Sequence, residues 1–493
     1  MKRKENGKSE LKPAGVFHFF NEICQVPRPS KKEEKIIAYL KAFGEKYNLE
    51  TKVDEAGNVL IKKPATPGKE NLKTVILQSH VDMVCEKNND TEHDFLTDPI
   101  ETEIDGEWMK AKGTTLGADN GIGVATELAI LADDSIEHGP LECLFTVDEE
   151  TGLTGAFALK EGFMNGEILL NLDSEDEGEL FIGCAGGIDS VAQFKYETVM
   201  TPISHLCFHI TVKGLKGGHS GGDIHLGRGN ANKILNRFLY LMQNTYQEDF
   251  FLFEFNGGNL RNAIPREASA VFSVPEHYKH DVRTALNVFI AEIEDELHKI
   301  EPDLSILLET EPRRDWAIDP STAYRLITSL YACPHGVYAM SHDIPGLVET
   351  STNLASVKMK PENTIRIETS QRSSILSSRD DVANTVRAVF TLAGAQVTWG
   401  DGYPGWKPNP DSEILKVAEE SYKRLFGVDA KVKAIHAGLE CGLFLDKYPA
   451  LDMISFGPTL TGVHSPDERM HIPSVDKFWK HLLDVLAHIP AKN

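Results

Sequence analysis

The sequence has little positive charge. It contains 51 Lys and Arg residues against 74 Asp and Glu residues, which gives a formal net charge of −23. Nucleic acids and anionic membrane surfaces attract proteins mainly through clustered Lys and Arg side chains. We therefore expect neither a nucleic-acid partner nor a membrane partner.

Long apolar runs and paired cysteines are missing as well. No segment has the roughly 20 consecutive apolar residues that a membrane span needs, and the basic stretch 1–10 is followed by no apolar segment of a signal peptide. The seven cysteines are an odd number without a CxxC spacing, which excludes a regular disulfide framework. These features predict a cytoplasmic enzyme with reduced, mostly buried cysteines.

The 493 residues, 41% of them hydrophobic, suffice for two or three globular domains. Up to about residue 183, apolar strands alternate with amphipathic helices, a pattern typical of an α/β sheet. We expect helices at 16–23, 33–43 and 121–131, and strands at 74–79, 141–147 and 167–173. Beyond the glycines near 183–187, strands and helices such as 207–212, 230–243 and 281–300 favour a second, α+β domain. The turn-rich segment 402–408 marks the return to the first domain.

The glycine-rich stretch 113–123 surrounds one acidic residue, Asp119. Glycines let the backbone take tight or left-handed geometry, so the carboxylate can be aimed at a partner. The alternative is that Asp119 caps the helix that follows.

Further candidate residues follow the ends of apolar runs, where an α/β sheet presents its chemistry. They are His80, Asp82, Glu149, Glu150, Asp173 and His464. Side chains alternate along a strand, so Asp82 can hold the His80 imidazole in one tautomer. Adjacent carboxylates such as Glu149 and Glu150 repel unless a cation or proton neutralises them. Each motif alone also fits a structural pair or a solvated surface turn, and we interpret Glu175, Asp176 and Glu177 as surface charge.

Three residues of the expected second domain complete the set of candidates. His219 lies in the glycine-rich stretch 214–222, and Asn262 lies in the polar loop 259–265. Arg372 can form a bidentate pair with a carboxylate. The alternative is that each is an ordinary polar residue on the protein surface.

Together these motifs resemble the M20 metallopeptidase family, over about residues 17–489. The motifs that carry the resemblance are His80-Val81-Asp82, Gly117-Ala118-Asp119-Asn120-Gly121, Asp148-Glu149-Glu150, Asn171-Leu172-Asp173, Gly217-Gly218-His219-Ser220-Gly221-Gly222, His436-Ala437-Gly438-Leu439-Glu440-Cys441-Gly442 and His464-Ser465-Pro466-Asp467-Glu468.

The resemblance implies an α/β zinc-peptidase catalytic domain, with a central mixed sheet flanked by helices, formed by residues 1–186 and 401–493. It also implies an inserted α+β lid or dimerisation domain at 187–400, and a homodimer. Two Zn²⁺ ions per chain, with Mn²⁺ or Co²⁺ possible, would be bridged by Asp119. The implied ligands are His80 and Asp173 at one site and Glu150 and His464 at the other, with Asp82 as the partner of His80.

The implied reaction is the hydrolysis of dipeptides with a free C-terminus, in particular Xaa-His dipeptides including β-Ala-His. Glu149 would act as the general base, His219 and Asn262 would stabilise the oxyanion, and Arg372 would bind the C-terminal carboxylate. His219 would reach the site from the lid or from a dimer partner. The alternatives are an amidohydrolase or deacylase of N-acyl amino acids, and a non-catalytic scaffold of the same fold.

Overall fold

The computed structural model describes residues 11–88 and 90–492. The basic stretch 1–10 lies outside the described residues. The described residues form two compact units: those of the first lie within Met1–Gly183, Pro408–Ala434 and Leu439–Asn493, and the second comprises Cys184–Lys407 and Ile435–Gly438. Within the described part, no helix is both long and apolar enough to cross a membrane.

A mixed sheet forms the centre of the first unit. Across the described residues its eight strands follow the order β1 (Glu50–Val53), β2 (Val59–Lys63), β6 (Leu141–Thr146), β3 (Val75–His80), β7 (Ile168–Asn171), β23 (Asp452–Ser455), β8 (Glu179–Cys184) and β22 (Lys431–Ile435). Strands β6, β3, β7 and β23 are parallel, whereas β2 and β8 join this parallel core in antiparallel fashion. Every residue of β3, β6 and β7 is buried, as expected for strands covered on both faces.

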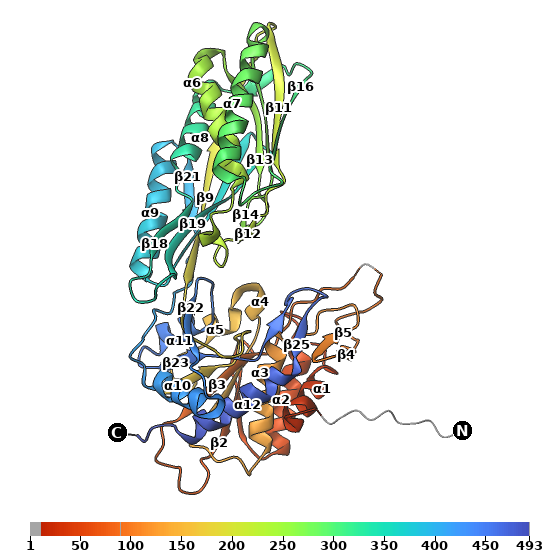
Figure 1. Ribbon diagram of the computed structural model, residues 1–493, viewed down its shortest axis with the longest axis vertical. Coiled ribbons are helices and arrows are strands. Elements are labelled where there is room, and N and C mark those ends of the chain that lie inside the picture. Colours follow the sequence, from red (N-terminus) through yellow and green to blue (C-terminus); the bar gives the residue numbers. More distant parts are fainter. Residues whose placement is uncertain (1–10, 89, 493) are drawn as a thin grey trace, which may run out of the picture. The chain divides into compact units, whose positions relative to one another are not determined.

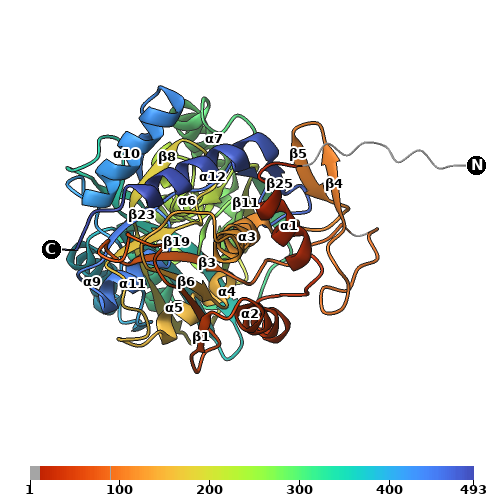
Figure 2. The same cartoon turned by 90° about the horizontal axis from the view of Figure 1, so that it is seen from below.

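Helices flank this sheet. The longer ones are α1 (Ala14–Ile23), α2 (Glu34–Lys46), α3 (Ala118–Ala132), α10 (Glu413–Phe426) and α12 (Ile472–Ala487). Helix α3 packs on β3 and against α1, while α10 packs on β23 and against α12 (Figure 1 and Figure 2). The short helices α4 (Glu149–Gly152), α5 (Thr154–Ala158) and α11 (Cys441–Lys447) lie in the connections. A smaller sheet joins β24 (Leu460–Thr461), β25 (Arg469–His471), β5 (Trp108–Ala111) and β4 (Thr102–Asp105) in that order.

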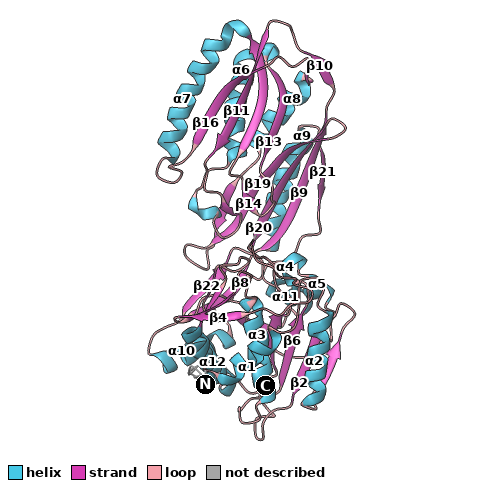
Figure 3. Cartoon of the chain, turned by 90° about the vertical axis from the view of Figure 1, so that its right-hand side faces the viewer, coloured by secondary structure: helices cyan, strands magenta, loops and turns pink. Residues whose placement is uncertain are grey.

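The second unit is built on a long antiparallel sheet. Its order in the described chain is β16 (Ser305–Glu311), β11 (His205–Lys213), β15 (Ala268–Pro275), β13 (Phe251–Gly257), β19 (Val348–Lys360), β20 (Thr364–Ser373), β9 (Gly186–Lys195) and β21 (Gln396–Trp399), with β18 (Gly336–Met340) paired to β19. Helices α6 (Ala231–Tyr246), α7 (Lys279–Leu297), α8 (Pro320–Ala332) and α9 (Leu376–Leu392) gather along one face (Figure 1 and Figure 3). Phe208, Phe238 and Phe272 belong to the apolar core of this unit.

The predicted fold class is confirmed, with a mixed α/β sheet in the first unit and an α+β arrangement in the second. Six of the seven cysteines are buried, and Cys85 is partly exposed. The interpretation of residues 175–177 as surface charge is wrong for two of the three. Glu175 and Glu177 are half-buried and only Asp176 is exposed, because the Glu177 carboxylate accepts a hydrogen bond from Tyr422 at 2.6 Å.

Candidate metal centre

The loop before α3 is fixed by a buried carboxylate, Glu468. Its two oxygens accept hydrogen bonds from four consecutive backbone amides, those of Leu116 at 2.7 Å, Gly117 at 2.9 Å, Ala118 at 2.8 Å and Asp119 at 3.3 Å. The backbone of Asp119 is not helical, and the helix runs regularly only from Gly121. Glu468 therefore determines where the Asp119 side chain starts.

Arg28 fixes the same loop from the other side. Its guanidinium donates to the carbonyl oxygens of Val81 at 3.0 Å and Asp82 at 3.2 Å, and to that of Gly117 at 2.5 Å. A Cβ atom at Gly117 or Gly121 would lie 2.6 Å from Arg28 Nη2. These two glycines thus leave the space through which Arg28 ties the Asp119 loop to the segment that follows β3.

The two oxygens of Asp119 face two different imidazoles. His80 Nε2 lies 3.1 Å from Asp119 Oδ1, and His464 Nε2 lies 3.2 Å from Asp119 Oδ2. The side-chain hydrogen bonds of Asp119 go to these two imidazoles, and the N-cap of α3 is Gly117, so the alternative of a helix cap is wrong. Although burial raises the pKa of Asp119, the hydrogen bonds of His464 and His80 lower it well below the usual value.

Each of these imidazoles also faces a second carboxylate. His80 Nε2 lies 3.4 Å from Asp173 Oδ1, and His464 Nε2 lies 3.0 Å from Glu150 Oε2. The five side chains form two groups of possible metal ligands, which share Asp119. The structure therefore brings the five predicted ligands together, and metal binding by them stays a prediction.

The donor set fits two divalent cations. Bonds of about 2.0–2.1 Å at tetrahedral angles place neighbouring ligand atoms roughly 3.3 Å apart, close to the 3.0–3.4 Å measured here. Burial raises the pKa of Asp173 to about 6, partly offset by the charge of His80, and raises that of Glu149 well above its usual value. Crowded, buried carboxyls of this kind are stabilised as anions by a cation.

Asp82 holds two parts of this centre at once. Its Oδ1 lies 3.3 Å from His80 Nδ1 and accepts a hydrogen bond from the backbone amide of Glu149 at 3.0 Å. Its Oδ2 accepts from the amide of Glu150 at 3.3 Å and from the Ser30 hydroxyl at 2.7 Å. The side chain expected to orient His80 therefore also orients the Glu149–Glu150 turn.

Glu149 lies beside the two groups and forms a further group of possible ligands with one residue of each, His80 and Glu150. One of its carboxylate oxygens lies within 4.8 Å of ligand atoms of His80 and Glu150. The raised pKa of Glu149 has burial as its main cause, opposed by the charge of His80 and reinforced by Asp173 and Glu440. A carboxylate so placed is a candidate general base.

A layer of buried polar side chains lies under the sheet edge. Glu440 Oε2 accepts hydrogen bonds from Gln78 Nε2 at 2.6 Å and from the Thr146 hydroxyl at 2.7 Å. Gln78 Oε1 accepts from Asn171 Nδ2 at 2.6 Å, and Asn171 Oδ1 accepts from the Ser455 hydroxyl. This chain of hydrogen bonds joins β6, β3, β7 and β23 two or three residues before His80, Glu149 and Asp173.

His219 and Asn262 lie next to each other in the second unit. Strand β12 (Gly218–His219) pairs with β14 (Ala263–Ile264), and the carbonyl oxygen of Asn262 accepts a hydrogen bond from the Ser220 amide at 2.8 Å. The Asn262 side chain is exposed. The pKa of His219 is lowered to about 4, first by burial and then by the charge of Arg372.

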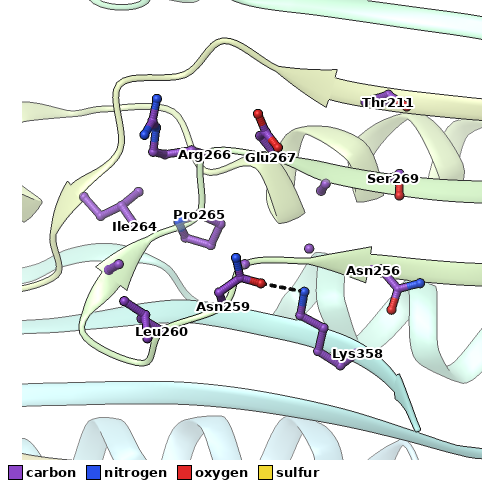
Figure 4. Close-up of a pocket in the computed structure, with 14 residues that line it drawn as sticks. Thr211, Asn256, Asn259, Leu260, Ile264, Pro265, Arg266, Glu267, Ser269 and Lys358 are labelled. Carbon is purple, nitrogen blue, oxygen red and sulfur yellow. Dashed lines mark hydrogen bonds between the residues drawn. The ribbon is translucent and has the colours of Figure 1, made fainter. Parts of the chain in front are cut away.

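A groove of about 550 Å³ is lined by residues on both sides of Asn262 in the sequence, among them Leu260 and Ile264 (Figure 4). Lys358 donates a hydrogen bond to Asn259 at 2.9 Å within it. The residues that line it include Leu260, Pro265 and Arg266, but not His219, Asn262 or Arg372.

Several residues that build the site were not predicted from the sequence. They are Arg28, Gln78, Glu440 and Glu468. Glu468 and Glu440 belong to motifs that carried the family resemblance. No local sequence pattern, however, indicates that Glu468 binds backbone amides or that Glu440 binds buried polar side chains. Arg28 stands between two prolines, a local pattern that indicates a turn. This pattern does not predict the contact of Arg28 with Gly117, 89 residues away.

Two groups of imidazole and carboxylate ligands, joined by a shared residue, follow the parallel strands of the mixed sheet. This arrangement suits hydrolases that use two metal ions. Residues 76–488 match the model of Peptidase family M20/M25/M40. The chain belongs to this family, as the motifs predicted, and is a hydrolase.

Individual relatives agree with this assignment. The chain is 46% identical over 484 residues to the cytosol non-specific dipeptidase of Escherichia coli, covering 98% of this chain and 99% of that protein. The crystal structure of aminoacylhistidine dipeptidase from Vibrio alginolyticus is also 46% identical, covers both chains completely and has a TM-score of 0.91. A Staphylococcus aureus tripeptidase shares only 18% identity at a TM-score of 0.57, with 97% of this chain and 99% of that chain covered, and therefore shows similarity of fold alone.

Proposed function

We propose that the protein is a metal-dependent dipeptidase that hydrolyses dipeptides with a free C-terminus, in particular Xaa-His dipeptides such as β-Ala-His. The observation that carries the proposal is the position of Asp119, whose two oxygens face His80 and His464 separately. The dipeptidase relatives, 46% identical over nearly the whole chain, support the substrate class.

The proposed cofactor is a pair of Zn²⁺ ions, for which Mn²⁺ or Co²⁺ could substitute. His80 and Asp173 would hold one ion, Glu150 and His464 the other, and Asp119 both. When bound, the ions would act as Lewis acids and lower the pKa of a water molecule to about 7.

Glu149 is the proposed general base. It would take the proton of the attacking water and later transfer this proton to the nitrogen of the leaving amine. Two features support the role: burial raises the pKa of Glu149 above its usual value, and Asp82 anchors its backbone amide at 3.0 Å.

His219 is the proposed hydrogen-bond donor to the oxyanion of the tetrahedral intermediate, together with Asn262. Its Nδ1 accepts hydrogen bonds from the amides of Gly221 at 3.3 Å and Gly222 at 3.0 Å. In a neutral imidazole the proton must then be on Nε2. The lowered pKa of about 4 keeps the ring neutral at pH 7, so Nε2–H is a donor.

Arg372 is the proposed binding group for the substrate's C-terminal carboxylate. Arg372 is 7% exposed, and its guanidinium has no carboxylate partner among the described residues. The side-chain hydrogen bond that it makes goes to the Tyr403 hydroxyl at 3.2 Å. A buried cation without an anion is costly, and the carboxylate of a dipeptide would neutralise it.

We further propose that the first unit is the catalytic domain and the second the lid and dimerisation domain. His219 would come from the lid of the same chain or of a dimer partner, and substrate-driven closure would exclude water from the reaction. The cytosolic relative and the acidic composition support a cytoplasmic location.

One experiment tests the proposed function. The enzyme is depleted of metal with a chelator, and each of Zn²⁺, Mn²⁺ and Co²⁺ is added back before assays with a dipeptide panel and with N-acetyl amino acids. We expect metal-dependent turnover of Xaa-His dipeptides. Faster turnover of N-acetyl amino acids would indicate a deacylase, and metal binding without any turnover would indicate a scaffold.

A further inference from the structure

Tyr403 stands in the turn-rich segment 402–408, to which the proposed mechanism gives no role. Its backbone is held firmly within the second unit. The Tyr403 amide donates to the Gly187 carbonyl oxygen at 2.8 Å, and the Gly187 amide donates back at 3.0 Å. The carbonyl oxygen of Tyr403 also accepts from Arg379 Nη1 at 2.7 Å. Three hydrogen bonds therefore fix where the side chain begins.

Two glycines leave space for the hydroxyl end of the Tyr403 ring. A Cβ atom on Gly187 would lie 2.7 Å from both Cζ and Oη of Tyr403. A Cβ atom on Gly438 would lie 3.0 Å from Cε2 and 3.1 Å from Oη. Cβ atoms do not approach other heavy atoms more closely than about 3.0 Å, so Gly187 cannot carry a side chain while the ring stays in place. The glycines thus define a slot that positions the phenol.

The Tyr403 hydroxyl accepts a hydrogen bond from Arg372 Nη1 at 3.2 Å. A phenol also has one proton to donate, and none of the described residues accepts it. Burial raises the pKa of Tyr403, which keeps this proton in place at neutral pH. Arg372 Nε is likewise buried and without a partner in the described structure. The unused phenolic proton therefore lies beside a guanidinium that has no carboxylate partner among the described residues.

A guanidinium beside a phenolic O–H forms a receptor for an anion with two or more oxygens. We propose that Tyr403 is a substrate-binding residue, whose hydroxyl donates a hydrogen bond to the C-terminal carboxylate that Arg372 pairs with. This inference rests on the proposed dipeptidase function and extends it. The pair gives specificity for a carboxylate over a carboxamide, because the amide cannot neutralise Arg372.

The test is the Tyr403→Phe variant of the zinc-loaded enzyme, with Tyr324→Phe as the matched control. Tyr324 lies on α8 and is 55% exposed. We expect the KM of Tyr403→Phe for β-Ala-His to rise about tenfold, the effect of losing one hydrogen bond to a charged group, with kcat within about twofold. The KM for the C-terminal amide of the same dipeptide should rise less than that for β-Ala-His, because a neutral amide oxygen accepts a weaker hydrogen bond than a carboxylate. Tyr324→Phe should match the wild type with both substrates.

A binding measurement keeps the inference independent of turnover. The Kd values of L-histidine and of histidinamide, which stand for the released residue with and without its carboxylate, are measured by calorimetry. Weaker binding of histidine alone by Tyr403→Phe supports the inference even if the wild type hydrolyses no dipeptide, a result that would overturn only the proposed function. Equal changes for both ligands, or unchanged Kd and KM values, would overturn the role of Tyr403.

Discussion

Glu468 and Asp119 are linked by a hydrogen bond of 3.3 Å from the Asp119 amide to Glu468 Oε1, the last of four such bonds from consecutive amides. Replacing Glu468 by Gln would turn an amide NH₂ group toward some of these donors. We expect the free energy of unfolding to fall by about 3 kcal/mol and metal affinity to fall about 10- to 100-fold, as measured by urea unfolding and metal titration. Asp467→Asn, at an exposed neighbouring position, should change neither quantity.

The shared position of Asp119 predicts unequal effects of ligand substitutions. Asp119→Ala should lose both metal equivalents, because it removes a ligand from both groups. His464→Ala should lose only the equivalent held with Glu150 and keep the one held by His80 and Asp173. Metal analysis of the purified variants measures this difference. Equal stoichiometry in the two variants would contradict a bridging role.

Glu149→Ala should retain both metals and lose most turnover. A general base contributes roughly 10²- to 10⁴-fold to a rate, so kcat should fall by about that factor while the KM changes little. Loss of metal from this variant would show that Glu149 is a ligand. Glu161→Ala, at an exposed position, serves as the matched control.

His219→Ala should keep its metal content and lose about 10²-fold in kcat, the effect of removing one donor to an oxyanion. The control is His225→Ala, since His225 is exposed and close in the sequence. Activity near that of the wild type would remove both the oxyanion role and the proposed closure of the lid.

Three histidines of the second unit, His436 buried and His219 and His335 partly buried, predict a dependence of stability on pH. Burial is the main cause that lowers the pKa of His219 and His335 to about 4 and that of His436 to about 3. An unfolded histidine has a pKa of about 6.5, so between about pH 6.5 and pH 4 the unfolded chain binds protons that the folded chain does not.

This contribution to stability is complete above about pH 6.5 and decreases as the pH falls. We expect the urea midpoint to be lower at pH 5 than at pH 7.5, and the difference to be smaller in His335→Gln. A midpoint that is unchanged between these pH values would contradict the prediction.

The main elements of the fold could be predicted because their periodicity is local. The apolar run 74–79 and the glycine-rich stretch before α3 gave β3 and the start of the helix to within a few residues. The set of candidate ligands could be named because each one follows a buried strand or a glycine-rich loop. Parallel strands bring such positions to one edge of a sheet.

The supports of the site could not be predicted in this way. Arg28 contacts Gly117, and Glu468 contacts Leu116, across 89 and 352 residues of sequence. Such contacts depend on how loops fold back, which no local pattern encodes. The surface interpretation of Glu175 failed for the same reason, since strand β24 and the loop after β7 meet through the hydrogen bond from the Leu460 amide to the Glu175 carbonyl oxygen.

The buried chain of Glu440, Gln78, Asn171 and Ser455 has a consequence for mutational tolerance. Each member is the hydrogen-bond donor or acceptor of its neighbour. Replacing any one of them by an apolar residue therefore leaves a buried polar atom of its neighbour without a partner. Single substitutions here should therefore be harmful one at a time, whereas a coordinated exchange of adjacent members could be accepted. The amide side chains of Gln78 and Asn171 lie inside otherwise apolar strands, two positions before His80 and Asp173. The same pattern in other sequences would indicate a metal centre supported by a buried hydrogen-bond network.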